Sequence, residues 1–347
     1  VSAINDASKQ LFTNLGVWSD ITSVRSQAYT NMHVWDKAGY GKLDFSLTDL
    51  PASEQNNELG HIIENKVIRT ALWQKAQQDN GIRFFTDDAL TGFGVADNDV
   101  FASFSKQMPI TAKMLVGADG ANSWVREQIK APMAFRDYDH HAVVATVACS
   151  QGHQNTAWQV FLPSGPLAFL PLYNSQLCSI VWSTSPQEAT RLLNLEQADF
   201  AKEITAASDG KLGSITLASE RASYPLSMRL VHDFVKDRVV LIGDAAHTIH
   251  PIAGQGFNLG VRDVKQFAEL VKKALPAGQD IGSGQLLNHY QINRQQDQKQ
   301  VIELTDSLVT LFSNELAPLV LGRNIGLKAF NYLSPLKRLL VNKAMGY

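Results

Sequence analysis

The sequence contains few cysteines, no long apolar run and no excess of charge of either sign. Its 347 residues include two cysteines, Cys149 and Cys178, which cannot build a disulfide framework or a zinc motif. Both lie in apolar, strand-like runs, so we expect buried thiols and a reducing, cytoplasmic setting. The 31 basic and 33 acidic residues nearly balance, which argues against a nucleic-acid partner held by phosphate contacts.

No stretch reaches the roughly 18 apolar residues that a membrane-spanning helix needs. The chain begins with polar residues 1–5 and no initiator methionine, where a signal peptide would place a basic and then an apolar leader. We therefore expect no signal peptide and interpret the start as that of a shortened chain. The hydrophobic content of 45% is enough for a large core and two packed domains.

Helical and strand-like periodicities alternate along the chain. A first helix is expected to begin at Asp6 or Ser8 as its cap and to stop at Gly16. Further helices are predicted over residues 65–78, 256–275 and from 286 onward. Residues 35–51 are interpreted as irregular strand and loop, and residues 112–116 and 238–242 as short strands. Four apolar runs indicate a mostly antiparallel sheet: 142–147, 158–162, 167–172 and 177–182.

The clearest chemical signal is the run GDAAHTIHPIAGQGFNLG at residues 243–260, directly after a predicted buried strand. The strand places the carboxylate of Asp244 at its carboxyl end, where α/β folds bind ligands. An ionised carboxylate only accepts hydrogen bonds, which suits the hydroxyls of a sugar or ribityl chain. Gly254 and Gly256 allow close approach to a flat ring and open a helix whose positive end favours negative charge. Since a reduced flavin carries such a charge, the run favours a flavin site over glycines that serve packing alone.

A second acidic turn occurs in the run LVGADGANSWVR at residues 115–126. Asp119 and Gly120 stand at this turn, again after a predicted strand. Arg126 is close enough in sequence to neutralise or orient the Asp119 carboxylate. A purely structural turn is the alternative for this segment when it is taken alone.

Together, the two runs resemble the flavoprotein aromatic hydroxylases, typified by para-hydroxybenzoate hydroxylase. Residues 1–5, 59–65, 138–142 and 178–183 are similar to the ubiquinone-biosynthesis branch of that family. The resemblance implies an α/β fold, in which a Rossmann-like FAD/NAD(P)-binding domain carries an inserted, mostly antiparallel substrate domain and a helical tail. It also implies hydroxylation of a polyprenylated phenol, with C5 as the expected ring carbon. FAD would be the cofactor, NADH or NADPH the reductant and O2 the co-substrate.

The resemblance also assigns roles by position. Asp119 and Gly120 match the family's turn near the pyrophosphate of FAD, and Asp244 matches the residue that binds the ribityl chain. Six residues match the segment along the flavin ring: Pro251, Gly254, Gln255, Gly256, Phe257 and Asn258. No acid–base residue is identified, so the catalytic residues stay unknown.

One departure from the family concerns its first βαβ unit, whose Gly-x-Gly-x-x-Gly turn holds the ADP part of FAD. This sequence contains no such fingerprint. We therefore expect weakened FAD affinity in the chain as it stands and no flavin in a crystal. The expected domains are an FAD-binding domain (1–20, 62–130 and 234–280), a substrate domain (21–61 and 131–233) and a helical region (281–347).

Several polar residues leave alternatives open. His247 and His250 would supply two metal ligands, but the sequence places no third, so no metal is expected. His250 could instead contact flavin or substrate. Glu64 could lie near the flavin or cap the following helix, and His140 and His141 could line the substrate pocket or lie on the surface.

The segment 310–347 carries one acidic and five basic residues among regularly spaced apolar ones. This pattern fits peripheral contact with an anionic inner membrane, and it equally fits a helix docked on the core. A quinone-biosynthesis complex is a further candidate partner. The alternative to an enzyme is a non-catalytic, FAD-free member of such a complex.

Overall fold

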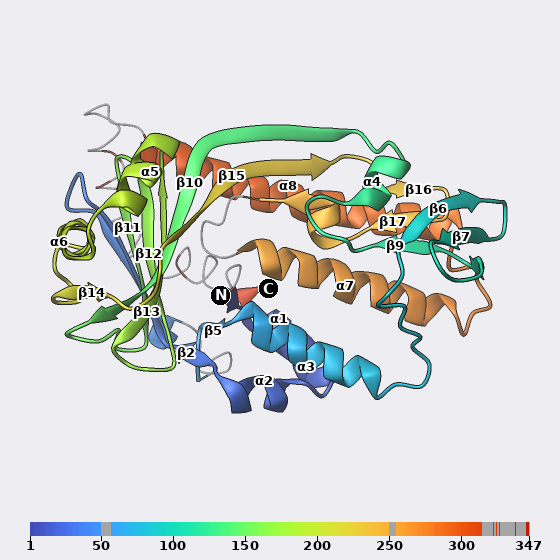
Figure 1. Ribbon diagram of the computed structural model, residues 1–347, viewed down its shortest axis with the longest axis horizontal. Coiled ribbons are helices and arrows are strands. Elements are labelled where there is room, and N and C mark those ends of the chain that lie inside the picture. The colour runs from blue at the N-terminus through green and yellow to red at the C-terminus, as the bar shows by residue number, and fades with distance from the viewer. Residues whose placement is uncertain are drawn as a thin grey trace.

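The computed structural model describes residues 1–49, 57–249 and 255–313, together with a few single positions after residue 321. Figure 1 shows a large sheet at one end of the molecule and smaller sheets with helices at the other. The long strands β10 (Met133–Cys149) and β15 (Ala222–Val231) run between the two ends and pair with each other. This arrangement confirms the predicted α/β fold with a separate β-rich part.

Among the described residues, nine strands form the large sheet, in the order β18-β15-β10-β13-β12-β11-β3-β4, with β14 also paired to β10. Every pair is antiparallel except β11 with β3, so the predicted mostly antiparallel sheet is confirmed. Its other strands are β3 (Asn31–Asp36), β4 (Lys42–Ser46), β11 (Thr156–Leu162), β12 (Gly165–Pro171), β13 (Leu177–Thr184), β14 (Ile215–Leu217) and β18 (His247–Thr248).

Residues 35–51 were expected to form irregular strand and loop, and the structure differs in that the strand at residues 42–46 is regular. These residues form β4 and pair with β3 in a regular hairpin. The side chains of Leu43 and Phe45 pack beside Val34 in a small apolar cluster. Their spacing of two places both on one face of the strand, which is the pattern of a half-buried strand.

One face of the large sheet is covered by helices α5 (Pro186–Asn194) and α6 (Gln197–Ala207). The core between them contains Val160, Leu192 and Phe200. Cys149 and Cys178 lie in the same core as free, buried thiols, as predicted. Because the helices cover only this face, the opposite face is left to line a cavity.

At the other end of the molecule, β16 (Val235–Lys236), β17 (Val239–Leu241) and β9 (Leu115–Gly117) form a small sheet. Helices α7 (Gln255–Ala274) and α8 (Gly284–Ser313) pack beside it, and α4 (Trp124–Gln128) follows β9. A separate antiparallel sheet consists of β6 (Leu90–Val95), β7 (Val100–Phe104) and β8 (Ile110–Ala112). The predicted strands and long helix of this region are therefore present.

A third sheet brings the start of the chain into the centre, where β5 (Gly60–Ile63) pairs with β1 (Ser2–Ile4) and β2 (Gln27–Tyr29). Helices α1 (Asp6–Asn14), α2 (Trp18–Val24) and α3 (Asn65–Gln77) pack beside it, and the short 3-10 helix η1 (Leu47–Asp49) follows β4. The side chain that caps α1 is Asn5, which accepts a hydrogen bond from the Ser8 amide at 3.0 Å. The predicted caps, Asp6 and Ser8, were therefore wrong by one and three positions, whereas Gly16 follows the helix as expected with φ of +72°.

None of the helices in the described part of the chain combines the length and apolar character that crossing a bilayer requires. The basic segment 310–347 lies almost entirely outside the described residues. Both interpretations of that segment stay predictions.

Candidate cofactor and substrate site

The two acidic turns found in the sequence lie at one edge of the small sheet. Strands β9 and β17 are parallel, with Gly117 opposite Leu241, so the turns at Asp119 and Asp244 follow the carboxyl ends of neighbouring strands. Arg126 connects the two turns. Its guanidinium donates to the carbonyl of Ala121 at 2.9 Å and to that of Ala245 at 3.1 Å.

The carboxylate of Asp119 holds the start of α4. It accepts hydrogen bonds from the Ser123 hydroxyl at 2.5 Å and from the Val125 amide at 3.1 Å. The expectation that Arg126 orients Asp119 was wrong, because Asp119 faces the free amides of the first helical turn while Arg126 reaches the carbonyls. Gly120 has φ of +83°, a conformation that favours glycine. Approach of a pyrophosphate to this turn stays a prediction.

Asp244 occupies a 3-10 turn, η3 (Gly243–Ala245), that directly follows β17. Its side chain is exposed to the cavity described below, and no described residue hydrogen-bonds to its carboxylate. Desolvation raises the pKa of Asp244, and the nearby Asp263 carboxylate adds to this while His247 opposes it. An acceptor group is therefore held open at the position predicted for a polyol chain.

A buried charge network that the sequence analysis missed lies beneath this turn. Asp263 on α7 is 1% exposed and accepts from the Gly243 amide at 2.9 Å, from His247 Nε2 at 2.6 Å and from Arg294 Nε at 2.6 Å. Desolvation alone would raise its pKa, but His247 and Arg294 outweigh this, so the pKa of Asp263 is lowered. The network fixes the turn that carries Asp244.

The sequence did contain a signal for this network. Asp263 follows the buried Leu259 by four positions and precedes the partly buried Phe267 by four, so an acid stands on the inward stripe of α7. A charge there requires a buried partner. His247 is used in this way, and no group of three or more His, Cys, Asp or Glu residues in the described ranges could hold a metal.

The start of α7 contributes the other predicted cofactor-binding residues. Pro251 and Gly254, like His250, lie outside the described residues, as does the side chain of Gln255. Gly256 and Phe257 line the cavity.

Asn258 also lines the cavity, but its side chain holds β1 and α1 against α7. The amide oxygen accepts from the Asn5 amide at 3.1 Å and from the Ser8 hydroxyl at 2.8 Å. The amide nitrogen donates to the Ala3 carbonyl at 2.8 Å. Cofactor contacts of the α7 start, including those of Asn258, stay predictions.

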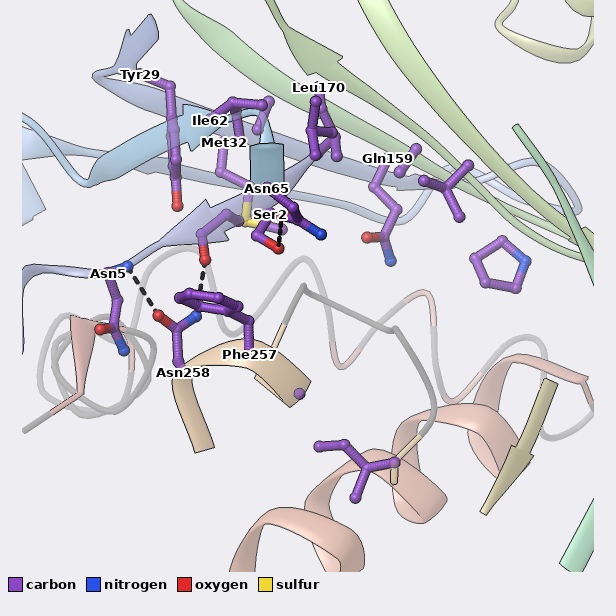
Figure 2. Close-up of a pocket in the computed structure, with 18 of the residues that line it drawn as sticks. Ser2, Asn5, Tyr29, Met32, Ile62, Asn65, Gln159, Leu170, Phe257 and Asn258 are labelled. Atoms are coloured by element: carbon purple, nitrogen blue, oxygen red, sulfur yellow. Dashed lines mark hydrogen bonds between the residues drawn. The ribbon is translucent and has the colours of Figure 1, made fainter. Parts of the chain in front are cut away.

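A cavity of about 390 Å³ lies between the start of α7, strand β1 and the open face of the large sheet. Asp244 and Gly256 line it from the side of the turn, together with Ser2, whose hydroxyl donates to Asn65 at 2.6 Å. Figure 2 shows Phe257 and Asn258 on one side, with Met32, Leu170 and Gln159 on the other. The volume lies within the range of small-molecule sites.

The large sheet forms the floor of this cavity, and the sequence analysis did not predict these residues. Met32 lies opposite Ala157, and continuing the β11–β12 register by one residue beyond Trp158 and Phe169 places Leu170 on the other side of Ala157. The next row along the strands consists of Gln159, Ala168 and Val181. All six side chains line the cavity, but they come from four strands and form no local motif.

Three residues left open by the sequence lie away from the cavity lining. Glu64 stands at the cap position of α3 without a capping hydrogen bond, and its carboxylate pairs with Arg25 at 3.2 Å. His140 Nδ1 lies 2.7 Å from the Tyr138 carbonyl, and His141 Nδ1 lies 3.1 Å from the Ser223 hydroxyl. Neither histidine lines the cavity.

The residues around the cavity suit the flavin end of FAD. An open carboxylate follows β17, and a helix start brings backbone amides and a positive dipole to the same space. The sequence contains no Gly-x-Gly-x-x-Gly turn for the ADP end. The fit therefore concerns the flavin ring and the ribityl chain.

Comparison with known proteins agrees with this geometry. A family model described as an FAD binding domain matches residues 2–305. The chain belongs to this family. The mitochondrial ubiquinone biosynthesis monooxygenase of Homo sapiens is 34% identical over 97% of this chain and 80% of its own length. The 3-demethoxyubiquinol 3-hydroxylase of Escherichia coli K12 is 33% identical over 100% of this chain and 87% of its own.

Solved structures show the same fold at low sequence identity. The p-nitrophenol 4-monooxygenase of Pseudomonas putida DLL-E4 has a TM-score of 0.78 and 17% identity, covering 99% of this chain and 88% of its own. A probable FAD-dependent monooxygenase of Pseudomonas aeruginosa has a TM-score of 0.79 and 18% identity, covering 94% and 89%. The predicted likeness to the ubiquinone-biosynthesis hydroxylases is confirmed for the family. Within that branch the sequence also resembles 2-octaprenylphenol hydroxylase, which is the basis of the expected hydroxylation at C5, and this finer likeness stays a prediction.

Proposed function

We propose that this chain hydroxylates the aromatic ring of a polyprenylated phenol in ubiquinone biosynthesis, using FAD, NADH or NADPH, and O2. One observation carries the proposal: a single cavity joins the Asp244 turn and the start of α7 to an apolar face of the large sheet. A cofactor at the turn would therefore face a substrate on the sheet. Relatives named for ubiquinone biosynthesis align over nearly the whole chain, which supports the substrate class.

On the cofactor side, the chain would bind and orient rather than react. The Asp244 carboxylate would accept hydrogen bonds from ribityl hydroxyls, and the amides of the first turn of α7 would favour negative charge on the flavin ring. When bound and reduced by NADH or NADPH, FAD would activate O2, so that one oxygen atom is transferred to the ring and the other leaves as water. The Asp263 network would keep the Asp244 turn in place.

On the substrate side, the sheet would hold the ring and exclude water. Met32, Leu170 and Val181 present apolar surface to the cavity, which suits a prenyl chain beside an aromatic ring. Exclusion of water from the site prevents side reactions of reactive intermediates. Among the described side chains that line this cavity, Asp244 is the one carboxylate and no histidine, lysine or arginine is present. Tyr29 also lines it, but burial raises the pKa of its hydroxyl to about 12, so we assign no proton-transfer residue.

The ring position is a separate part of the proposal. Resemblance to 2-octaprenylphenol hydroxylase favours C5. Position 3 is the second candidate, because the Escherichia coli relative at 33% identity is named as a 3-hydroxylase. Peripheral contact with the inner membrane, or with a quinone-biosynthesis complex, would give access to a polyprenylated substrate.

The purified chain tests the proposal in two steps. With FAD added in large excess, to offset the weakened affinity expected without the Gly-x-Gly-x-x-Gly turn, we expect a yellow protein that oxidises NADH or NADPH when a polyprenylphenol is present. Mass spectrometry and NMR of the product would then distinguish hydroxylation at C5 from position 3. A colourless chain that ignores added FAD would contradict the proposal and favour a non-catalytic partner. Sedimentation with anionic vesicles would test membrane contact separately.

A further inference from the structure

Gln159 places a primary amide in the middle of the cavity floor. The residue lies on β11 and is only 7% exposed, yet its side chain extends from the sheet into the cavity (Figure 2). Its cross-strand neighbours are Ala168 on β12 and Val34 on β3, both apolar. A polar group at this position is unusual for the open face of an apolar sheet.

Within the described part of the chain, the Gln159 amide is left open to a ligand. Among the described residues, no side chain or backbone group hydrogen-bonds to the Gln159 side chain. Because Gln159 lines the cavity, the hydrogen bonds of this amide are available to a molecule that binds there. Glutamine offers two N–H donors and one carbonyl acceptor, so a ligand with a hydroxyl group could satisfy it.

Two alanines beside Gln159 create space for a flat ring. Ala157 precedes it by two positions on the same face of β11, and Ala168 lies directly opposite on β12. We call the surface formed by these two alanines the Ala157–Ala168 shelf. Larger side chains surround it, with Met32 and Leu170 along one side and Val181 beyond Ala168. Directly opposite residues lie roughly 5 Å apart, so a ring on the alanines would be within reach of the amide.

We propose that Gln159 recognises the ring oxygen of a phenol or catechol that lies on the Ala157–Ala168 shelf. The phenolic O–H would donate to the amide carbonyl, while the apolar side at Met32 and Leu170 would receive the prenyl chain. This order of polar and apolar groups would fix which ring carbon faces the flavin. The inference rests on the proposed function and specifies the substrate contact within it.

Binding of two probes to the whole chain tests this role without relying on turnover. Isothermal titration calorimetry would compare 2-geranylphenol with geranylbenzene, which lacks the hydroxyl. The parent chain should prefer the phenol by about tenfold, the scale of one buried hydrogen bond. Gln159→Met, similar in size but without the amide, should bind the two probes equally and bind geranylbenzene as the parent does.

A matched control is Gln176→Met, the same change at an exposed turn of the same sheet, which should keep the tenfold preference. Gln159→Leu provides the same comparison if Gln159→Met does not fold, as judged by circular dichroism. Retention of the phenol preference in either variant would overturn the role of Gln159. If the parent chain bound neither probe, the proposed function itself would fail, which is a different result.

Discussion

The two sides of the cavity are built by opposite means. On the cofactor side, Asp244 stands on a turn that is fixed by the buried, hydrogen-bonded side chains of Asp263, His247 and Arg294. On the substrate side, Ala157, Ala168 and their neighbours are neutral and are fixed only by strand register. A charged network tolerates little change because each buried charge needs its partner. A neutral floor can change in shape without leaving unpaired groups.

This difference has a consequence for function. The side that would hold a cofactor depends on buried polar groups that are paired with one another, whereas the side that would hold the substrate can vary by exchange of small and large apolar residues. Substitutions on the two sides should therefore separate stability, cofactor retention and substrate binding.

The largest expected effect is on stability, from Asp263→Ala. The change would leave Arg294 and His247 without their shared buried acceptor, and loss of one partner of a buried pair costs about 3–5 kcal/mol. Urea unfolding should show a loss of this size. Asp297→Ala, which removes a more exposed partner of Arg294, should cost clearly less. Equal losses would contradict the view that burial makes the network important.

Asp244→Ala should separate cofactor retention from stability. We expect at least a tenfold weaker retention of FAD, because the ribityl hydroxyls would lose an acceptor, with little change in the melting temperature of the FAD-free chain. The melting temperature should hold because no described residue bonds to this carboxylate. Asp233→Ala, a nearby exposed acid, is the control. Equal flavin occupancy in both variants, measured by absorbance, would refute the assigned role.

Ala168→Leu should act on the substrate side alone. The larger side chain would fill the shelf beside Gln159, so we expect 2-geranylphenol to bind roughly tenfold more weakly, within the range for steric changes in apolar pockets. FAD retention should stay at the parent level. Ala206→Leu, on the exposed face of α6, controls for the added bulk. A parallel loss of FAD would show that the two sides are not independent.

The smallest effect is expected from the Arg238–Asp280 ion pair, in which Arg238 is buried and Asp280 is exposed. It provides a comparison with the fully buried Asp263–Arg294 pair. Hydrogen bonds from Arg238 lower the pKa of Asp280 from 3.8 to about 2. A carboxyl group whose pKa is lower in the folded than in the unfolded chain stabilises the fold at pH values above its unfolded pKa. The contribution of Asp280 is therefore complete above pH 3.8 and is lost as the pH falls toward 2. Because Asp280 is 38% exposed, solvent screening limits the gain to below about 1 kcal/mol. Urea unfolding of Asp280→Asn across this pH range would measure it.

Local motifs made much of the molecule predictable. The long helix after residue 255, the strands at 239–241 and 115–117, and four strands of the large sheet follow from periodicity and from turn residues. Short-range patterns did not predict contacts between residues that are far apart in the sequence. Arg126 was expected to contact Asp119, seven residues away, but it bonds to the carbonyl of Ala245 because β9 and β17 are neighbours.

The sequence by itself determined the family, the two acidic turns and the open carboxylate at Asp244, because a strand, a turn and a helix start are encoded within about twenty consecutive residues. Only the tertiary structure decided that Gln159 and the two alanines form a floor opposite that carboxylate. Ala157 and Gln159 are two residues apart on one strand, a spacing common to every half-buried strand, and Ala168 joins them from the next strand through a register that the packed sheet sets as a whole.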